Sequence, residues 1–408
     1  MTSPGRDEAL RSLAQTWLGL HGGASEPMDL VRAEVLHPGR PGLLDLVVRS
    51  GDRLAHLVIG LRTVADTPHF LRPAEECGLG ILDDEDGLAV CADALRDAEF
   101  TSLLLATVRG VPARPGPVSV VHDDEELTQL DCGDRGDVAV FPWLAEQPRP
   151  DVDLLVALEG VGFNHVAAPL VRWAWQGRDL GLVLESLGDR TGGWALALTS
   201  LRDFYASGGL PEVAGGDFAA EARSLGTMTA RMHLALDRAF GRQPEPVSGW
   251  VHEAERTIAE ADATLLDGPG VADLLKWLRE SDARLPVIRS HGDFHLGRTS
   301  RTDQGWVVSD CRPGGVVASA SSPRPRTPLG DVADLLWSMH QASALTASER
   351  DPTGRWGLSV LAQAWERRNR RAFITGYLGT AGITGLVGPD RDLARRLVSF
   401  LELARSVR

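Results

Sequence analysis

The spacing of apolar and polar residues predicts a mixed first part of the chain followed by a helical second part. Residues 6–20 repeat apolar side chains with a helical period, which is typical of an amphipathic helix. The apolar runs LLDLVVRS and LAHLVIGL, joined by Gly-Asp, predict a pair of strands between about residues 29 and 61. A third apolar segment, residues 91–109, is expected to be helical.

The Pro- and Gly-rich segment PARPGP, residues 112–117, predicts a boundary after this first region. Residues 118–187 contain short strand-like runs and one expected helix over residues 150–161. From Asp189 onward helical periodicity dominates. The expected helices lie at residues 194–206, 217–239, 249–265, 270–283, 328–345 and 358–378. The sequence thus predicts an α+β protein with three parts, at residues 1–112, 118–188 and 189–408.

One polar stretch in the helical part, residues 291–310 (HGDFHLGRTSRTDQGWVVSD), carries the clearest chemistry. Two short extended runs flank a turn at residues 302–305, which predicts a hairpin. A hairpin returns the chain to its starting point, so Asp293 and Asp310 are expected to lie close together at its open end. Such a pair suits one base and one magnesium ligand, because Mg²⁺ binds hard oxygen ligands and leaves room for phosphate oxygens. The spacing therefore suggests phosphoryl transfer.

The same stretch allows a second interpretation. His291, Asp293 and His295 form an HxDxH pattern that is compatible with zinc ligation, although no further cluster of ligands in the sequence supports zinc. Otherwise His291 is expected to hold the loop through hydrogen bonds to the backbone.

Composition excludes several classes of protein. The chain has 408 residues, with 43% hydrophobic and 24% charged residues, which is typical of a globular protein with more than one core. Its net charge of −14 opposes binding to nucleic acid or to an anionic membrane. No apolar run is long enough to span a bilayer and no secretory signal is visible, so a cytoplasmic location is expected. The four cysteines are scattered singly, which suggests neither disulfides nor a zinc site.

Several collinear motifs between about residues 138 and 380 resemble those of the maltokinase and actinobacterial glucosamine kinase family. The family's catalytic loop, HGDxHLGQ, is matched by residues 291–298, HGDFHLGR. Its DFEGEP segment is matched by residues 310–315, and its SPLRDVAGMLRS segment by residues 327–338. The family has the two-lobed, protein-kinase-like fold of the aminoglycoside phosphotransferases. The resemblance therefore implies an N-terminal cap subdomain over residues 1–112, a β-rich N-lobe over residues 118–188 and a helical C-lobe over residues 189–408.

The resemblance also implies a role for each residue around the polar stretch. Asp293 corresponds to the catalytic base that orients the sugar hydroxyl, and Asp310 corresponds to a magnesium ligand. Asp331 corresponds to the helix carboxylate that holds the backbone of the catalytic loop, with His291 and His295 as further structural support.

The nucleotide site that the resemblance implies lies in the β-rich part. Glu185, Ser186 and Leu187 belong to the segment that corresponds to the hinge beside adenine. ATP and Mg²⁺ are the implied cofactors, and a sugar or aminosugar is the implied substrate. The family's nucleotide-binding lysine, however, aligns with Ala139, and the carboxylate that would pair with it is Asp153.

Two further departures change the expected electrostatics. The chain has a single lysine, Lys276, which lies in a predicted helix and is expected to be solvated, so it does not replace the missing cation. The family's second magnesium ligand, Gln or Asn, is Arg298 in this chain. A guanidinium group has only donors and cannot ligate a metal ion.

These departures favour a catalytically impaired relative that still binds a small molecule or a protein partner. An alternative is an active ATP-dependent sugar or aminosugar kinase that uses Asp293, in which Asp310 holds one Mg²⁺ and Arg298 supplies positive charge to the phosphate in place of the missing lysine and second metal ion. A third hypothesis is a kinase of another hydroxylated small molecule, because the family's C-terminal signature at the sugar site has no match in this sequence.

Overall fold

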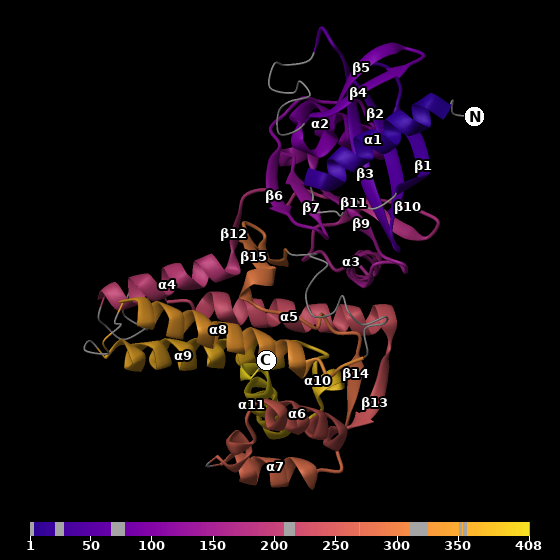
Figure 1. The fold of residues 1–408 in the computed structure, drawn as a ribbon. Helices are drawn as coiled ribbons and strands as arrows, with labels where there is room; N and C mark the ends of the chain where they lie inside the picture. Colours follow the sequence, from indigo (N-terminus) through magenta and orange to yellow (C-terminus); the bar gives the residue numbers. More distant parts are fainter. Residues whose placement is uncertain are drawn as a thin grey trace. The chain divides into compact units, whose positions relative to one another are not determined.

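The computed structural model contains two compact units (Figure 1). The first contains the described residues up to Asp153 together with Ala168–Gly188, and the second contains Leu154–Ala167 and the described residues from Asp189 onward. The sequence-based division into three parts stays a prediction. The structure describes residues 4–20, 28–66, 78–207, 217–268, 270–309, 325–350, 353 and 357–407.

The first unit contains two antiparallel sheets. One has the strand order β1-β2-β3-β5-β4, with β9 also paired to β3, and the other has the order β10-β11-β8-β7-β6. The strands of the first sheet are β1 (Met28–His37), β2 (Gly42–Ser50), β3 (Arg53–Thr63), β4 (Gly78–Asp84), β5 (Gly87–Asp93) and β9 (Trp143–Leu144). Those of the second are β6 (Ser119–Asp123), β7 (Thr128–Asp131), β8 (Asp137–Val140), β10 (Pro169–Trp175) and β11 (Arg178–Leu184).

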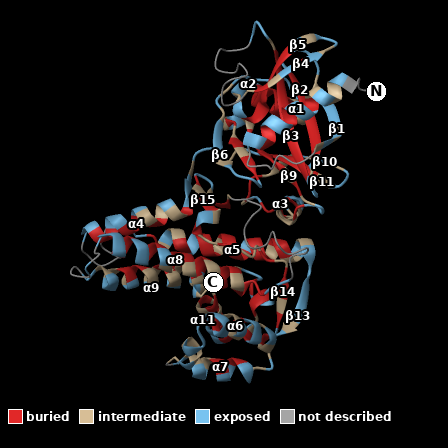
Figure 2. Ribbon diagram, in the orientation of Figure 1, coloured by how far each residue is buried: buried red, intermediate tan, exposed pale blue. Residues whose placement is uncertain are grey.

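The strand pair expected between residues 29 and 61 is confirmed as the β2–β3 hairpin. Ser50 pairs with Arg53 across a turn in which Gly51 has a φ of 59°, a conformation that glycine adopts without steric cost. Nearly all of β2 and β3 is buried, as Figure 2 shows, because both faces of these strands are covered. Helix α1 (Pro4–Leu20), which matches the expected helix at residues 6–20, contributes to the core on one of these faces.

The prediction of a helix over residues 91–109 is wrong at its start and correct from Ala98 onward. Cys91 belongs to β5 and pairs with Leu61 of β3, so the chain is still extended there. Helix α2 (Ala98–Arg109) begins only after Asp97, whose carboxylate accepts hydrogen bonds from the N–H groups of Glu99 and Phe100. Periodicity alone cannot separate a buried strand from a buried helix, and β5 is buried along most of its length.

The second unit is mainly helical. The expected helices in residues 194–378 are confirmed as α4 to α9, whereas α10, α11, strand β12 and the sheet of β13 and β14 were not predicted. The helices are α4 (Gly193–Ser207), α5 (Ala219–Phe240), α6 (Val247–Asp262), α7 (Val271–Arg279), α8 (Leu329–Arg350), α9 (Leu358–Leu378), α10 (Thr384–Val387) and α11 (Arg391–Ser406), and α3 (Pro150–Gly160) precedes them. The two sheets are β12 (Arg190–Gly192) with β15 (Thr299–Thr302) and β16 (Gly305–Val308), and β13 (Arg242–Pro246) with β14 (Arg284–Ile288). None of the described helices is long and apolar enough to cross a membrane.

Helices α5 and α9 of the second unit pack against each other at a very short distance. A Cβ atom added to Gly226 of α5 would lie 2.1 Å from the backbone oxygen of Phe373, and one added to Gly376 of α9 would lie 2.0 Å from that of Arg223. Only glycine permits this approach, and it places the helix faces that carry His233 and Tyr377 against each other.

We predict that Gly226→Ala lowers the free energy of unfolding by about 1–3 kcal/mol, because the two helix backbones must separate to admit the methyl group. Gly249→Ala on α6 is the matched control: nothing lies within 4 Å of its added Cβ, so stability should be unchanged or slightly higher. Chemical denaturation of both variants measures the difference. Equal stability of the two variants would contradict the close crossing.

Candidate active site

A buried carboxylate holds the polar loop that the sequence singles out. Asp331 lies in the first turn of α8 and is 1% exposed. Its two oxygens accept hydrogen bonds from the backbone N–H groups of His291 and Gly292, each at 2.8 Å. Gly292 has a φ of 86°, which favours glycine at this turn. The loop conformation is therefore fixed by one side chain.

His233 of α5 completes this arrangement. Its Nε2 lies 3.1 Å from Asp331 Oδ2, and its Nδ1 lies 2.9 Å from the Tyr377 hydroxyl. Because a carboxylate only accepts, Nε2 carries the proton toward Asp331 and Nδ1 accepts from Tyr377. Burial raises the pKa of Asp331, but the hydrogen bonds from His233 and from the N–H of Gly292 outweigh it and hold the pKa below its usual value.

Asp293 comes directly after Gly292 in this loop. Its carboxylate lies close to nitrogen atoms of Arg298, Arg405 and His295. Arg298 Nη2 lies 2.9 Å from one carboxylate oxygen, and Arg405 Nη2 lies 3.4 Å from the other. His295 Nε2 is 3.7 Å away, while His295 Nδ1 accepts a hydrogen bond from the N–H of Gly297. His295 and then Arg298 hold the pKa of Asp293 well below its usual value. Asp293 is therefore ionised at neutral pH.

Arg405 is a site residue that the sequence did not reveal. It lies near the end of α11, and its Nε is also 3.2 Å from Asp334 of α8. Arg405 thus bridges a helix carboxylate and Asp293, which are far from it in the sequence. The amphipathic pattern of residues 391–406 is typical of a helix, but it does not indicate which residue of that helix returns to the loop.

The hairpin expected after the loop is confirmed by the pairing of β15 with β16, with Thr302 opposite Gly305. The backbone N–H of Ser309 donates to the Arg298 oxygen at 3.0 Å, so the returning chain reaches the loop. Asp310 and the rest of the segment that resembles DFEGEP lie outside the described residues. The expected proximity of Asp293 and Asp310 therefore stays a prediction.

The described residues do not gather as a metal site: no three His, Cys, Asp or Glu side chains among them are arranged as ligands. His291, Asp293 and His295 are all described, so the zinc interpretation of this pattern is wrong for this conformation. Arg298, at the position of a second magnesium ligand, is ion-paired with Asp293. The residues at these positions do not fit a site with two magnesium ions.

A cavity of about 130 Å³ lies beside the loop in the second unit, and Gly292 and Asp331 line part of its wall. Its rim carries the carboxylates of Glu245, Glu253 and Asp334. Trp250 also lines it and donates its indole N–H to Glu245 at 3.2 Å, while Arg405 and Arg326 are the cationic side chains of the wall. A carboxylate-bordered cavity next to an ionised aspartate suits a small polar ligand with a positive charge.

In the first unit, the structure gives Asp153 a partner that the sequence interpretation missed. Ala139 of β8 pairs with Leu182 of β11, and Leu182 pairs with Arg172 of β10, so these three residues lie in one row across the sheet. Arg172 Nη1 lies 2.9 Å from Asp153, and the Arg172 guanidinium also binds Asp179. Asp153 therefore has an arginine partner, which lies two strands away from Ala139.

Glu185, Ser186 and Leu187 follow β11 directly in the first unit. The N–H of Glu185 donates to the Ala168 oxygen at 2.8 Å, which ties this segment to the chain that leads into β10. Of the predicted site residues, the structure brings together His291, Asp293, His295, Arg298 and Asp331 in the second unit. Asp153 and the expected hinge belong to the first unit.

A sheet with the order β10-β11-β8-β7-β6, followed by a helical unit whose polar loop is held by a helix carboxylate, defines a kinase-like fold. No family model matches the sequence. The sequence is 28% identical to a glucosamine kinase of Streptacidiphilus jiangxiensis over 410 residues, which cover 92% of this chain and 88% of that protein. It is also 28% identical to a glucosamine kinase of Mycolicibacterium smegmatis over 290 residues, which cover 65% of this chain and 69% of that protein.

The structure is similar to solved glucosamine kinases. It matches a glucosamine kinase in complex with glucosamine, ADP and inorganic phosphate with a TM-score of 0.68 at 22% identity, over 100% of this chain and 94% of that chain. It matches another glucosamine kinase crystal structure with a TM-score of 0.67 at 23% identity and the same coverage. The chain is therefore similar to glucosamine kinases in sequence over 92% of its length, and similar to them in fold over its whole length.

We predict that Asp331→Asn lowers the free energy of unfolding by about 3 kcal/mol at neutral pH, because an amide NH₂ then faces the donors that the carboxylate accepts. The folded-state pKa of Asp331 is depressed, so its contribution is present above the unfolded value of about 4 and is lost as pH falls through the folded value. The difference from the wild type should therefore shrink in acid. Denaturation at several pH values measures it, with the exposed turn variant Asp303→Asn as control; a difference that is constant with pH would contradict this account.

Proposed function

We propose that this chain is an ATP-dependent kinase that phosphorylates a hydroxyl group of an aminosugar. The observation that carries the proposal is the framework of the loop, in which Asp331 fixes the backbone of His291 and of Gly292, which lines the acidic cavity, and so positions the ionised Asp293 that follows Gly292. Phosphoryl transfer depends chiefly on positioning and electrostatics, and this framework supplies the positioning of the acceptor. The similarity to glucosamine kinases supports the same class of substrate.

The charge of the cavity supports an amino group on the acceptor. Glu253 is exposed on α6 and its carboxylate forms no hydrogen bond or ion pair with the described residues, and the Glu245 carboxylate is bound only by the neutral indole of Trp250 among them. An ammonium group would give these carboxylates a cationic partner. A neutral sugar would leave them with water alone.

In the proposed reaction Asp293 accepts the proton of the acceptor hydroxyl or orients that hydroxyl toward the γ-phosphate of ATP. Asp310 is proposed as the ligand of one Mg²⁺ from the sequence resemblance alone, and Mg²⁺ would neutralise charge on the phosphates. Arg298 lies against Asp293 and supplies positive charge in place of a second metal ligand. Glu185, Ser186 and Leu187 are proposed as the segment that meets the adenine.

Ala139 favours a second candidate function, a catalytically impaired relative that binds its ligand without turning it over. The side chain at this position is a methyl group that is 5% exposed, so it offers no charge to nucleotide phosphates. The Arg172–Asp153 pair preserves the ion pair of the sheet, but Arg172 is held there by two carboxylates. A slow kinase and a non-catalytic binder therefore differ in whether nucleotide still binds productively.

We predict that Asp293→Asn lowers the rate of aminosugar-dependent ADP formation at least about a hundredfold, because the amide cannot accept the acceptor proton. The free energy of unfolding should change by only about 1 kcal/mol, because the ion pairs of Asp293 are partly solvated. A coupled ADP assay and thermal unfolding measure both quantities, and Asp303→Asn is the control for the same change of charge. Turnover that persists in Asp293→Asn would exclude it as the base.

We also predict that Glu253→Gln raises the KM for an aminosugar about threefold to tenfold and leaves the KM for the same sugar without its amino group unchanged. The reason is that the carboxylate interacts with the ammonium group and with no other part of the acceptor. Glu260→Gln, an exposed carboxylate further along α6 that does not line the cavity, is the matched control. An equal rise for both sugars would show that Glu253 does not recognise the amine.

A further inference from the structure

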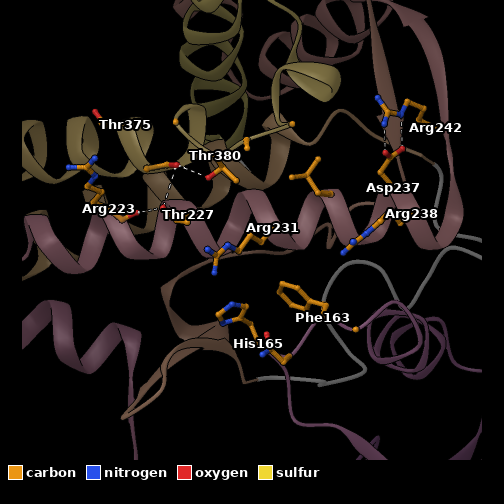
Figure 3. Close-up of a pocket in the computed structure, with 17 residues that line it drawn as sticks. Phe163, His165, Arg223, Thr227, Arg231, Asp237, Arg238, Arg242, Thr375 and Thr380 are labelled. Carbon is orange, nitrogen blue, oxygen red and sulfur yellow. Dashed lines mark hydrogen bonds and ion pairs between the residues drawn. The ribbon is translucent and has the colours of Figure 1, made fainter.

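Three arginines of α5 line a cavity of about 840 Å³ in the second unit, where Arg223 extends toward Thr375 and Arg231 toward His165 (Figure 3). Arg223, Arg231 and Arg238, with Thr227 between the first two, follow a helical spacing of three to four residues per turn and therefore lie on one side of the helix. The cavity is bounded on its other sides by residues 162–165 and by the end of α9.

These three guanidinium groups have no partner among the described residues, although each is a strong donor. Arg242, which also lines the cavity, shows the contrast: it binds both oxygens of Asp237 and the backbone oxygen of Gly385. Within the described part of the lining, Asp237 is the one carboxylate. The lining thus carries four arginines against one aspartate, in a chain whose net charge is −14.

The floor of the cavity is rigid and polar. The close crossing of α5 and α9 at Gly376 forms it, and the Thr380 hydroxyl donates to the Gly376 oxygen at 2.9 Å. His165 lies near Arg231 (Figure 3), and its Nδ1 donates to the Trp306 oxygen at 2.9 Å. Burial, with the charge of Arg231 acting in the same direction, lowers the pKa of His165. The wall therefore carries exposed positive charge above a closely packed floor.

This arrangement has the chemistry of a site for phosphate groups. Guanidinium groups bind phosphate oxygens through two parallel hydrogen bonds. With a rise of about 1.5 Å per residue, the Cα atoms of Arg223 and Arg231 are about 12 Å apart along the helix, and those of Arg231 and Arg238 about 10 Å. One phosphate does not satisfy groups at this spacing, and the cavity volume lies in the range of small-molecule sites.

We propose that the arginine face of α5 binds a small molecule that carries two or more phosphate groups. The site is separate from the candidate active site, because the two cavities share none of their described lining residues. His233, two positions from Arg231, points instead to Asp331 and the catalytic loop. One helix therefore forms the proposed site on one side and supports the catalytic loop on the other.

Isothermal titration calorimetry with inorganic tripolyphosphate tests the proposal at constant ionic strength. The wild-type chain is compared with Arg231→Gln/Arg238→Gln and with the matched control Arg256→Gln/Arg367→Gln, which removes two exposed arginines of α6 and α9 that do not line the cavity. We expect saturable binding to the wild type and the control, and at least a tenfold lower affinity in the cavity variant, because two charge-assisted hydrogen-bonding groups are removed. Thermal unfolding of both variants should be unchanged, because none of these side chains has a partner among the described residues.

A hexose bisphosphate and inorganic phosphate in parallel titrations identify the source of the phosphate groups. Binding of the bisphosphate with the same dependence on Arg231 and Arg238 would point to a phosphate ester, and binding of tripolyphosphate alone would point to an inorganic oligophosphate. Absence of saturable binding to the wild type would overturn the proposal. So would equal affinity in the wild type and the cavity variant, because tripolyphosphate would then bind elsewhere, for example at a nucleotide site.

Discussion

The second unit depends on the hydrogen bonds that Asp331 accepts. One buried carboxylate joins α8 to the polar loop through the N–H groups of His291 and Gly292, and joins both to α5 through His233. A buried charge of this kind is stable only when its acceptor positions are filled, so the three elements are held in one relative arrangement. The close packing of α5 and α9 at Gly226 and Gly376 also helps to hold this arrangement, because it places Tyr377 within hydrogen-bonding distance of His233. The position of Asp293 follows from these contacts.

Asp293 forms ion pairs with two arginines that come from different parts of the second unit. Arg298 comes from its own loop, and Arg405 comes from α11, where it also binds Asp334. These contacts keep the carboxylate ionised and oriented, which suits a group that aligns an acceptor hydroxyl. They also place C-terminal residues of the described chain in the wall of the proposed acceptor cavity. The carboxylates of Glu245, Glu253 and Asp334 distinguish the lining of this cavity from the arginine-lined cavity on α5, so the ligands proposed for the two cavities have opposite charge.

Local sequence patterns predicted many of the helices and strands of this structure. They did not predict the contacts between residues that are distant in the sequence. The hairpin of β15 and β16 and the long helices α5, α8 and α9 follow from turn residues and apolar periodicity. The end of β5 was mistaken for helix, because its burial on both faces removes the alternation that marks a strand. The contact of Arg405 with Asp293 joins residues 112 positions apart. The partner of Asp153 is Arg172 of β10, whereas the resemblance placed a lysine at position 139 of β8. Such pairings depend on tertiary packing, which no local pattern encodes.

The central claim, that the chain is a kinase with an altered nucleotide site, is tested most directly by thermal unfolding of the purified wild-type chain with ATP, in the presence and absence of Mg²⁺. A ligand that binds only the folded state raises the melting temperature, and raises it further as its affinity increases. The account predicts stabilisation by ATP that increases with Mg²⁺, because Asp310 is proposed to hold the metal ion against the phosphates while Ala139 contributes no charge. No stabilisation by ATP under either condition would contradict the account and would leave a protein with the kinase-like fold but without its nucleotide.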